Sequence, residues 1–107
     1  MIRTATRHDV SAIFGLIEEL ASFERAPEQV VNTPAQLEID LFEDPICSAI
    51  VATNRSEEVI GFALYYISYS TWKGRCLYLE DFYVKEAERK QGYGQALFDE
   101  IVLIAKK

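Results

Sequence analysis

The sequence is short of the residue types that build metal and redox centres. It contains one histidine, His8, and two cysteines, Cys47 and Cys76, among 107 residues. Neither cysteine belongs to a C-x-x-C pair or lies near a histidine cluster, which argues against metal binding and redox shuttling. We therefore expect no bound metal, reduced and partly buried thiols, and a surface or helix-capping position for His8.

Long apolar runs and positive charge are scarce as well. No stretch approaches the roughly 20 apolar residues that cross a bilayer, and residues 1–4 lack the apolar core of a signal peptide. The chain carries 17 acidic and 11 basic residues, a formal net charge of −6, which repels nucleic-acid phosphates and anionic lipid headgroups. These features predict a soluble cytoplasmic protein with no nucleic-acid or membrane partner. Acidic walls would suit a cationic ligand.

Two helices are expected in the first half of the chain. Apolar residues recur at spacings of three and four over 10–21, which predicts an amphipathic helix with Asp9 as its N-cap. The segment Thr33-Pro34-Ala35-Gln36 combines a capping-box signature with a first-turn proline and predicts a second, shorter helix. The polar linker 25–32 between them is expected to form a surface loop.

The second half has the composition of a sheet followed by one more helix. We expect strands at 48–52, 59–69 and 77–84, turns at 54–58 and 71–75, and a closing helix at 95–107. With a short extended start, the order is strand, two helices, three strands and a helix. Half of the residues are hydrophobic, so 1–107 can bury one core. This predicts a single α/β or α+β domain with helices flanking a largely antiparallel sheet.

A glycine turn between the last strand and the closing helix carries the chemical information. Gly92 and Gly94 let the backbone approach a ligand closely, and the first N–H groups of a helix lack partners and carry its positive dipole end. A pyrophosphate fits such a place. A turn that merely starts the helix is the structural alternative. The dinucleotide fingerprint and the P-loop are poor matches, because a third glycine and G-K-S/T are missing.

The segment Arg89-x-x-Gly92-x-Gly94 after a strand resembles the acetyl-CoA signature Q/R-x-x-G-x-G/A of the GNAT N-acetyltransferases. The resemblance extends along the chain to the diamine (spermidine/spermine) acetyltransferase branch. Matching segments occur in the same order at 2–9, 16–21, 28–30, 60–66 and 72–84.

The resemblance implies a GNAT-like mixed sheet and acetyl-CoA as co-substrate. In the family, the last strand before the turn splays from its neighbour and binds the pantetheine arm through its backbone, and the turn holds the pyrophosphate. Carried over to the matching positions, the arm-binding residues are Phe82, Tyr83 and Val84. The implied phosphate-binding residues are Arg89, Lys90, Gln91, Gly92, Tyr93, Gly94 and Gln95.

The resemblance also implies the residues that act on the amine. Glu80 matches the carboxylate that accepts a proton from the substrate amine, directly or through a water; Asp81 points to the opposite face if the strand is regular. Phe23 and Glu24 match a polyamine-contact segment, with Phe where the diamine enzymes typically carry Tyr. Without the resemblance, Glu80 and Asp81 would be strand-end charges, and Phe23 and Glu24 a frayed helix end.

Diamine acetyltransferases continue beyond the closing helix with further strands, a helix and a general-acid Tyr. We therefore expect 1–107 to be a GNAT domain that is incomplete at its C-terminus and that forms a homodimer. The expected function is acetyl transfer to a primary amine of a polyamine or diamine. The alternatives are a thialysine-like amino acid as the acceptor, or a non-catalytic acyl-CoA-binding fragment.

Overall fold

Four antiparallel strands form the centre of the computed structural model, which describes all residues from Met1 to Lys107. The strand order in the sheet is β1-β2-β3-β4, so each strand pairs with its sequence neighbour and β4 is an outer strand. The strands are β1 (Ile2–Thr4), β2 (Ser48–Thr53), β3 (Val59–Ser70) and β4 (Gly74–Val84). The antiparallel sheet expected from the sequence is confirmed.

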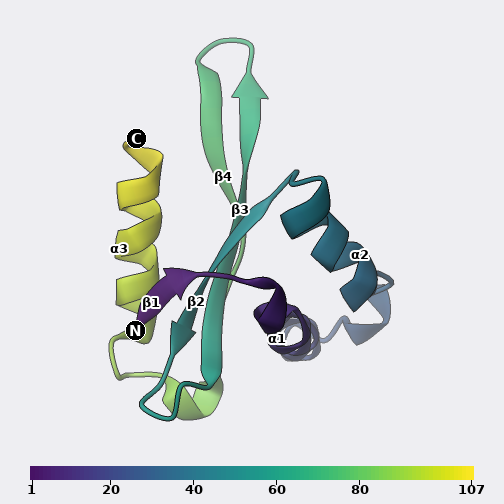
Figure 1. Ribbon diagram of the computed structural model, residues 1–107, viewed down its shortest axis with the longest axis vertical. Coiled ribbons are helices and arrows are strands. Elements are labelled where there is room, and N and C mark those ends of the chain that lie inside the picture. The colour runs from purple at the N-terminus through teal and green to yellow at the C-terminus, as the bar shows by residue number, and fades with distance from the viewer.

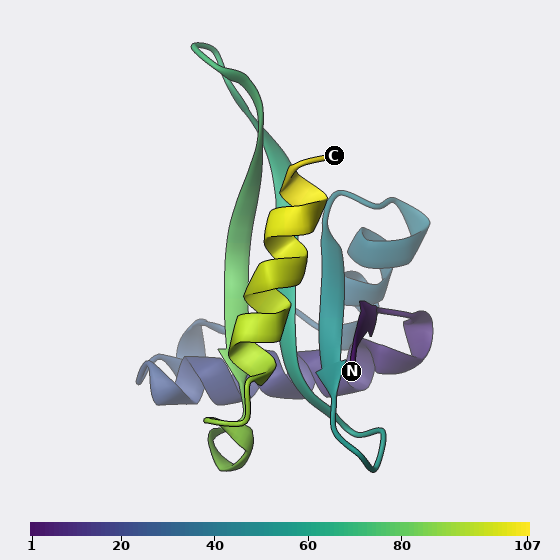
Figure 2. The same ribbon diagram turned by 90° about the vertical axis from the view of Figure 1, so that its left-hand side faces the viewer.

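Helices cover both faces of this sheet. One face is covered by α1 (Val10–Phe23) and α2 (Pro34–Glu38), which continues as a π-helical turn, Ile39–Glu43; α3 (Tyr93–Ala105) lies on the other face (Figures 1 and 2). Each side has its own apolar cluster: Phe62 and Leu16 belong to the α1 side, and Leu97 to the α3 side. All three side chains are almost fully buried. The expected order of elements is therefore confirmed.

The β3–β4 hairpin extends well beyond the helices (Figure 1). Its turn is tighter than predicted, because Gly74 adopts a φ of +86° and pairs with Ser70, so β4 begins at Gly74 and not at residue 77. Trp72 at the tip is 93% exposed. The tyrosines Tyr66 and Tyr78 stack across the hairpin with ring centroids 5.2 Å apart.

A one-residue bulge interrupts β4 close to its end. Leu79 and Asp81 pair with consecutive residues of β3, which leaves Glu80 between them without a partner. Tyr83 packs in the α1-side cluster, whereas Leu79, four residues earlier, packs against the α3-side cluster. In a regular strand these two residues would share a face, so the bulge reverses the alternation of side chains. The condition of a regular strand, on which the expected direction of Asp81 rested, is therefore not met.

Both predicted N-cap residues stand at the start of their helices, but only one of them caps through its side chain. Thr33 caps α2 by accepting a hydrogen bond from the Gln36 amide at 3.1 Å, although the Gln36 side chain donates to Asp40 and not back to the cap. Asp9 occupies the N-cap position of α1 as predicted, but its side chain makes no capping hydrogen bond. A 3₁₀ turn, Arg7–Asp9, precedes the helix, so the Asp9 carboxylate reaches back to the Thr6 amide at 2.8 Å.

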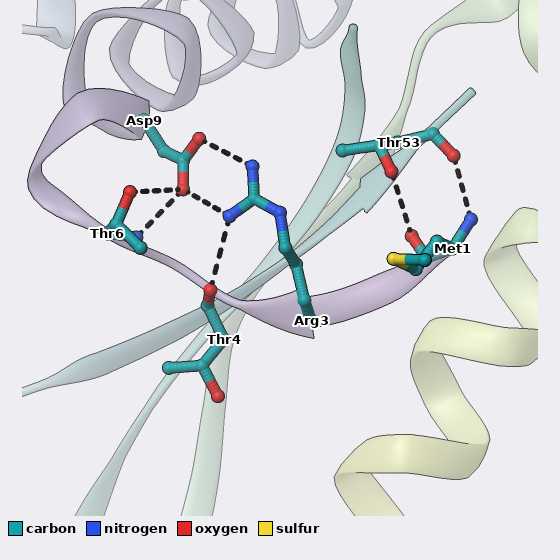
Figure 3. A network of polar contacts seen from close by, with 6 residues as sticks. All are labelled: Met1, Arg3, Thr4, Thr6, Asp9 and Thr53. Carbon is teal, nitrogen blue, oxygen red and sulfur yellow. Dashed lines mark hydrogen bonds and ion pairs between the residues drawn. The ribbon is translucent and has the colours of Figure 1, made fainter. Parts of the chain in front are cut away.

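This backward reach of Asp9 fastens β1 to the start of α1 (Figure 3). Its two carboxylate oxygens accept bonds from the two terminal nitrogens of Arg3, at 2.7 and 3.0 Å. The Asp9 side chain is 6% exposed and that of Arg3 is 37% exposed. The hydrogen bonds from Arg3 hold the pKa of the Asp9 carboxyl below its usual value, although burial opposes the shift. This is a bidentate, charge-assisted pair, the strong form of such contacts.

We expect Asp9→Asn to lower the free energy of unfolding at pH 7 by about 1.5–3 kcal/mol, the usual contribution of hydrogen bonds to a charged group. Because the folded-state pKa is depressed, the stabilisation is present above the unfolded pKa of about 3.9 and is lost as the pH falls through the folded value. Urea unfolding at pH 7 and in acid measures the difference between variant and parent.

Glu38→Gln is the control, because the exposed ion pair between Arg7 and Glu38 should contribute about 0.5 kcal/mol or less. A pH-independent cost of Asp9→Asn would contradict the assignment of the effect to the ionised carboxylate.

Candidate functional site

The glycine turn lies between the end of β4 and the start of α3, at the end of the sheet opposite the hairpin tip (Figure 2). Its backbone is unusual at two positions: φ is +69° at Lys90 and +89° at Gly92. Gly92 is the N-cap of α3, and no side chain caps the helix there. The first helical hydrogen bond runs from the Ala96 amide to the Gly92 carbonyl. The amides before it therefore remain available for an anion.

A pocket of about 500 Å³ adjoins this turn. It is formed by the C-terminal part of α1, the end of β4 and the start of α3. Its lining residues are Leu20, Phe23, Phe82, Tyr83, Val84, Arg89, Lys90, Gly92, Gly94 and Gln95. The structure therefore brings together all of the residues predicted to bind the cofactor except two. Gln91 and Tyr93 line a separate recess of about 290 Å³ on the β2–β3 turn side.

The end of β4 offers this pocket a strand edge with no neighbouring strand, since β4 is the outer strand. Tyr83 and Val84 are each 7% exposed, and they pack in the clusters on opposite faces of the sheet. Their side chains are thus committed to the core, and their backbone groups are what a ligand could reach. Phe82 is 36% exposed and contributes an apolar wall.

Arg89 spans the gap between the turn and α1. Its Nε donates to the Val84 carbonyl at 2.9 Å. Its guanidinium carbon lies 5.2 Å from the centroid of the Phe23 ring and 5.4 Å from that of the Tyr83 ring. Both distances are within the range of cation–π attraction. Phe23, predicted from the sequence for the amine, therefore lies in the same pocket as the predicted cofactor residues.

A second set of contacts holds the turn from the side of the β2–β3 turn. The side-chain NH₂ group of Asn54 donates to one oxygen of the Glu88 carboxylate at 3.1 Å. The other Glu88 oxygen accepts from the Gln91 side chain at 3.3 Å. The Asn54 side-chain oxygen in turn accepts from the Ser56 and Glu58 amides. Sequence reasoning missed Asn54, because nothing in a polar turn indicates which distant loop it contacts.

The two adjacent carboxylates at the β4 bulge differ in environment. Glu80 is exposed and Asp81 is half-buried. Burial raises the pKa of the Asp81 carboxyl, and the charges of Glu80 and Glu24 raise it further. Neither Glu80 nor Glu24 lines the 500 Å³ pocket. Asp81 is a second candidate proton acceptor, which the sequence did not single out. The bulge that brings it toward Glu24 leaves no signature in the residue types.

No group of three or more His, Cys, Asp or Glu side chains is arranged to hold a metal ion. Both cysteines are free and half-buried. None of the helices is long and apolar enough to cross a membrane.

Comparison with known proteins gives three findings. The model of the acetyltransferase (GNAT) family matches residues 13–107. Thialysine N-epsilon-acetyltransferase of Bos taurus is 42% identical over 113 residues, covering 98% of this chain and 66% of that protein. Spermidine/spermine N(1)-acetyltransferase-like protein 1 of Homo sapiens is 36% identical over 111 residues, covering 97% of this chain and 16% of that protein. The chain thus spans 66% of the length of the bovine relative.

Solved structures support the same fold. The crystal structure of a possible acetyltransferase from Clostridium difficile 630 superposes with a TM-score of 0.81 at 22% sequence identity. That superposition covers 100% of this chain and 71% of the other.

The two glycines of the turn should respond differently to substitution. Gly92→Ala should cost about 1–2 kcal/mol, because its φ of +89° is a left-handed conformation that side chains resist. Gly94→Ala should be neutral or stabilise by up to about 1 kcal/mol, since it lies within α3. The nearest atoms to its added Cβ, on Phe82, are an ordinary 3.9 Å away. Urea unfolding of both variants tests this, and equal effects would contradict the backbone assignment.

Proposed function

This chain belongs to the acetyltransferase (GNAT) family, and from that premise we propose that its protein transfers the acetyl group of acetyl-CoA to a primary amine of a polyamine or diamine. The observation that carries the proposal is the 500 Å³ pocket that joins the outer edge of β4 to the uncapped start of α3. A strand edge and a helix N-terminus together suit a ligand with an amide-containing arm and a pyrophosphate.

The chain's own residues divide the binding of acetyl-CoA between them. In this proposal the backbone of Phe82, Tyr83 and Val84 forms hydrogen bonds with the pantetheine arm of acetyl-CoA. The turn from Arg89 to Gln95 receives the phosphates, with Arg89 and Lys90 adding positive charge. Gln91 and Tyr93 act on the far side of the turn, in the smaller recess. Gly94 lines the pocket and, having no Cβ, leaves its backbone uncovered where a ligand would approach.

The amine must lose a proton before it attacks the thioester. With a reference pKa near 10.4, neutralising it at pH 7 costs roughly 4–5 kcal/mol. We assign the proton acceptor to Glu80, whose exposed carboxylate can accept directly or through a water. The neutral amine nitrogen then bonds to the thioester carbonyl carbon, the C–S bond breaks, and the sulfur leaves as CoA thiolate. The new amide nitrogen sheds its second proton and the thiolate takes one up, so the products are the N-acetylated amine and CoA.

Negative charge around the bulge favours a cationic acceptor. Glu80, Asp81 and Glu24 lie close enough for both glutamates to raise the pKa of Asp81. A further recess beside Phe23 is lined by Glu18, Glu19 and Glu86. Clustered carboxylates raise the local concentration of an ammonium group. We assign Glu24 and Phe23 to the amine end, at the C-terminus of α1.

Thialysine-like amino acids are the second candidate acceptor, since the bovine relative named for that substrate is 42% identical. A non-catalytic acyl-CoA-binding role is the alternative from another class. A homodimer and a cytoplasmic location remain part of the proposal.

The direct test mixes the protein with acetyl-CoA and, in separate reactions, spermidine, putrescine, thialysine and a peptide with a free N-terminus. We expect saturable CoA release with the polyamines, because the acidic surroundings favour multiply charged amines. Preference for thialysine would select the second candidate. Binding of acetyl-CoA without turnover of any amine would select the non-catalytic role, and absence of binding would refute the proposal.

Glu80→Gln should reduce the transfer rate about 10²-fold or more at neutral pH, the usual contribution of a general base. The difference in rate between Glu80→Gln and the parent should narrow as the pH approaches the pKa of the amine, because the substrate then loses its proton unaided. Asp81→Asn is the matched control at the neighbouring residue, and its transfer rate should fall less than that of Glu80→Gln. Rate–pH profiles of both variants decide between them, and a larger loss in Asp81→Asn would transfer the role to Asp81.

A further inference from the structure

The C-terminal part of α1 is fastened at three points to the end of β4 and to the connection between β4 and α3. The Tyr83 hydroxyl donates to the Glu19 carboxylate at 3.3 Å, and the Lys85 ammonium lies 3.6 Å from the other oxygen of the same carboxylate. The third point is the contact of Phe23 with Arg89. The helix end proposed to meet the amine is thus in contact with the turn proposed to hold the phosphates.

The Phe23 ring is not there to fill the core. Phe23 is 63% exposed, and it belongs to neither apolar cluster. Its contact is with the guanidinium of Arg89, which also lies close to the buried Tyr83 ring. Two rings at 5.2 and 5.4 Å hold one planar cation.

Arg89 is held in place without its charge being neutralised. Its Nε is bonded to the Val84 carbonyl, which uses one of its five N–H groups. Its terminal nitrogens make no hydrogen bond or ion pair within the protein, and Arg89 lines the pocket together with Lys90. A long side chain on an exposed turn would otherwise sample many rotamers and lose that freedom on binding an anion.

We infer that Phe23 is a positioning residue for acetyl-CoA: its ring, with that of Tyr83, holds the Arg89 guanidinium ready for the phosphates of the co-substrate. This inference rests on the proposed function and deepens it. Phe23, which lies at the amine end of the proposed site, then acts on the acetyl-CoA end as well, through Arg89. An aromatic ring is required at this position, whereas a hydroxyl is not.

The test is a double-mutant cycle with acetyl-CoA affinity as the readout. Phe23→Leu, Phe23→Tyr, Arg89→Met and the double variant Phe23→Leu/Arg89→Met are titrated with acetyl-CoA by calorimetry. A partly exposed cation–π contact predicts a 2- to 5-fold higher Kd for Phe23→Leu, about the effect of such contacts. Phe23→Tyr keeps the ring and should bind like the parent. In the Arg89→Met background, Phe23→Leu should have no further effect, because the cation that it positions is gone.

Phe98→Leu is the matched control, since Phe98 is a half-exposed phenylalanine on α3 that does not line the pocket. Its Kd should equal that of the parent, and circular dichroism checks that each variant is folded. An unchanged Kd for Phe23→Leu would overturn the inference, as would an equal loss with and without Arg89. Failure of the parent itself to bind acetyl-CoA is a different result, because it would refute the proposed function and the inference together.

Discussion

The pairing of β3 with β4, with its single unpaired residue at Glu80, is the constraint on which the site depends. Strand β4 leads directly into the glycine turn, so its register decides which side chains face α1 and which face α3. Before the bulge in the chain, Leu77 and Leu79 pack toward α3; after it, Tyr83 packs toward α1. Without the bulge, Tyr83 would leave the α1 side and could not contact Arg89.

The turn that follows is held from both sides before any ligand arrives. Arg89 fastens it to the β4 end and to α1, and Glu88 fastens it to Asn54 of the β2–β3 turn. Lys90, a non-glycine residue with positive φ, adopts a conformation that a free turn would seldom populate. Because the turn is already ordered in the folded protein, binding an anion there does not incur the entropy cost of ordering it. Such a turn is suited to preorganised recognition of an anion.

Opposite charges are separated over a short distance in this region. The pocket side carries Arg89, Lys90 and the positive end of α3, whereas the bulge side carries Glu80, Asp81 and Glu24. In the proposed reaction, the anionic acyl donor and the cationic amine would therefore be drawn to different parts of the site. A net charge of −6 overall conceals this local arrangement, and composition alone could indicate only the acidic part.

Local residue patterns determined the elements of this protein, and contacts between distant residues determined the site. The periodicity of 10–21, the cap at Thr33, the β-rich segments and the glycines at 92 and 94 act over a few residues, so the sequence was sufficient to predict them. It was not sufficient for the bulge at Glu80, the half-burial of Asp81 or the placing of Arg89 against Phe23. The bulge and the burial of Asp81 depend on the register of β3 against β4. The placing of Arg89 depends on the packing of α1 against β4, which joins residues far apart in the sequence, as in the bond between Tyr83 and Glu19, 64 positions apart.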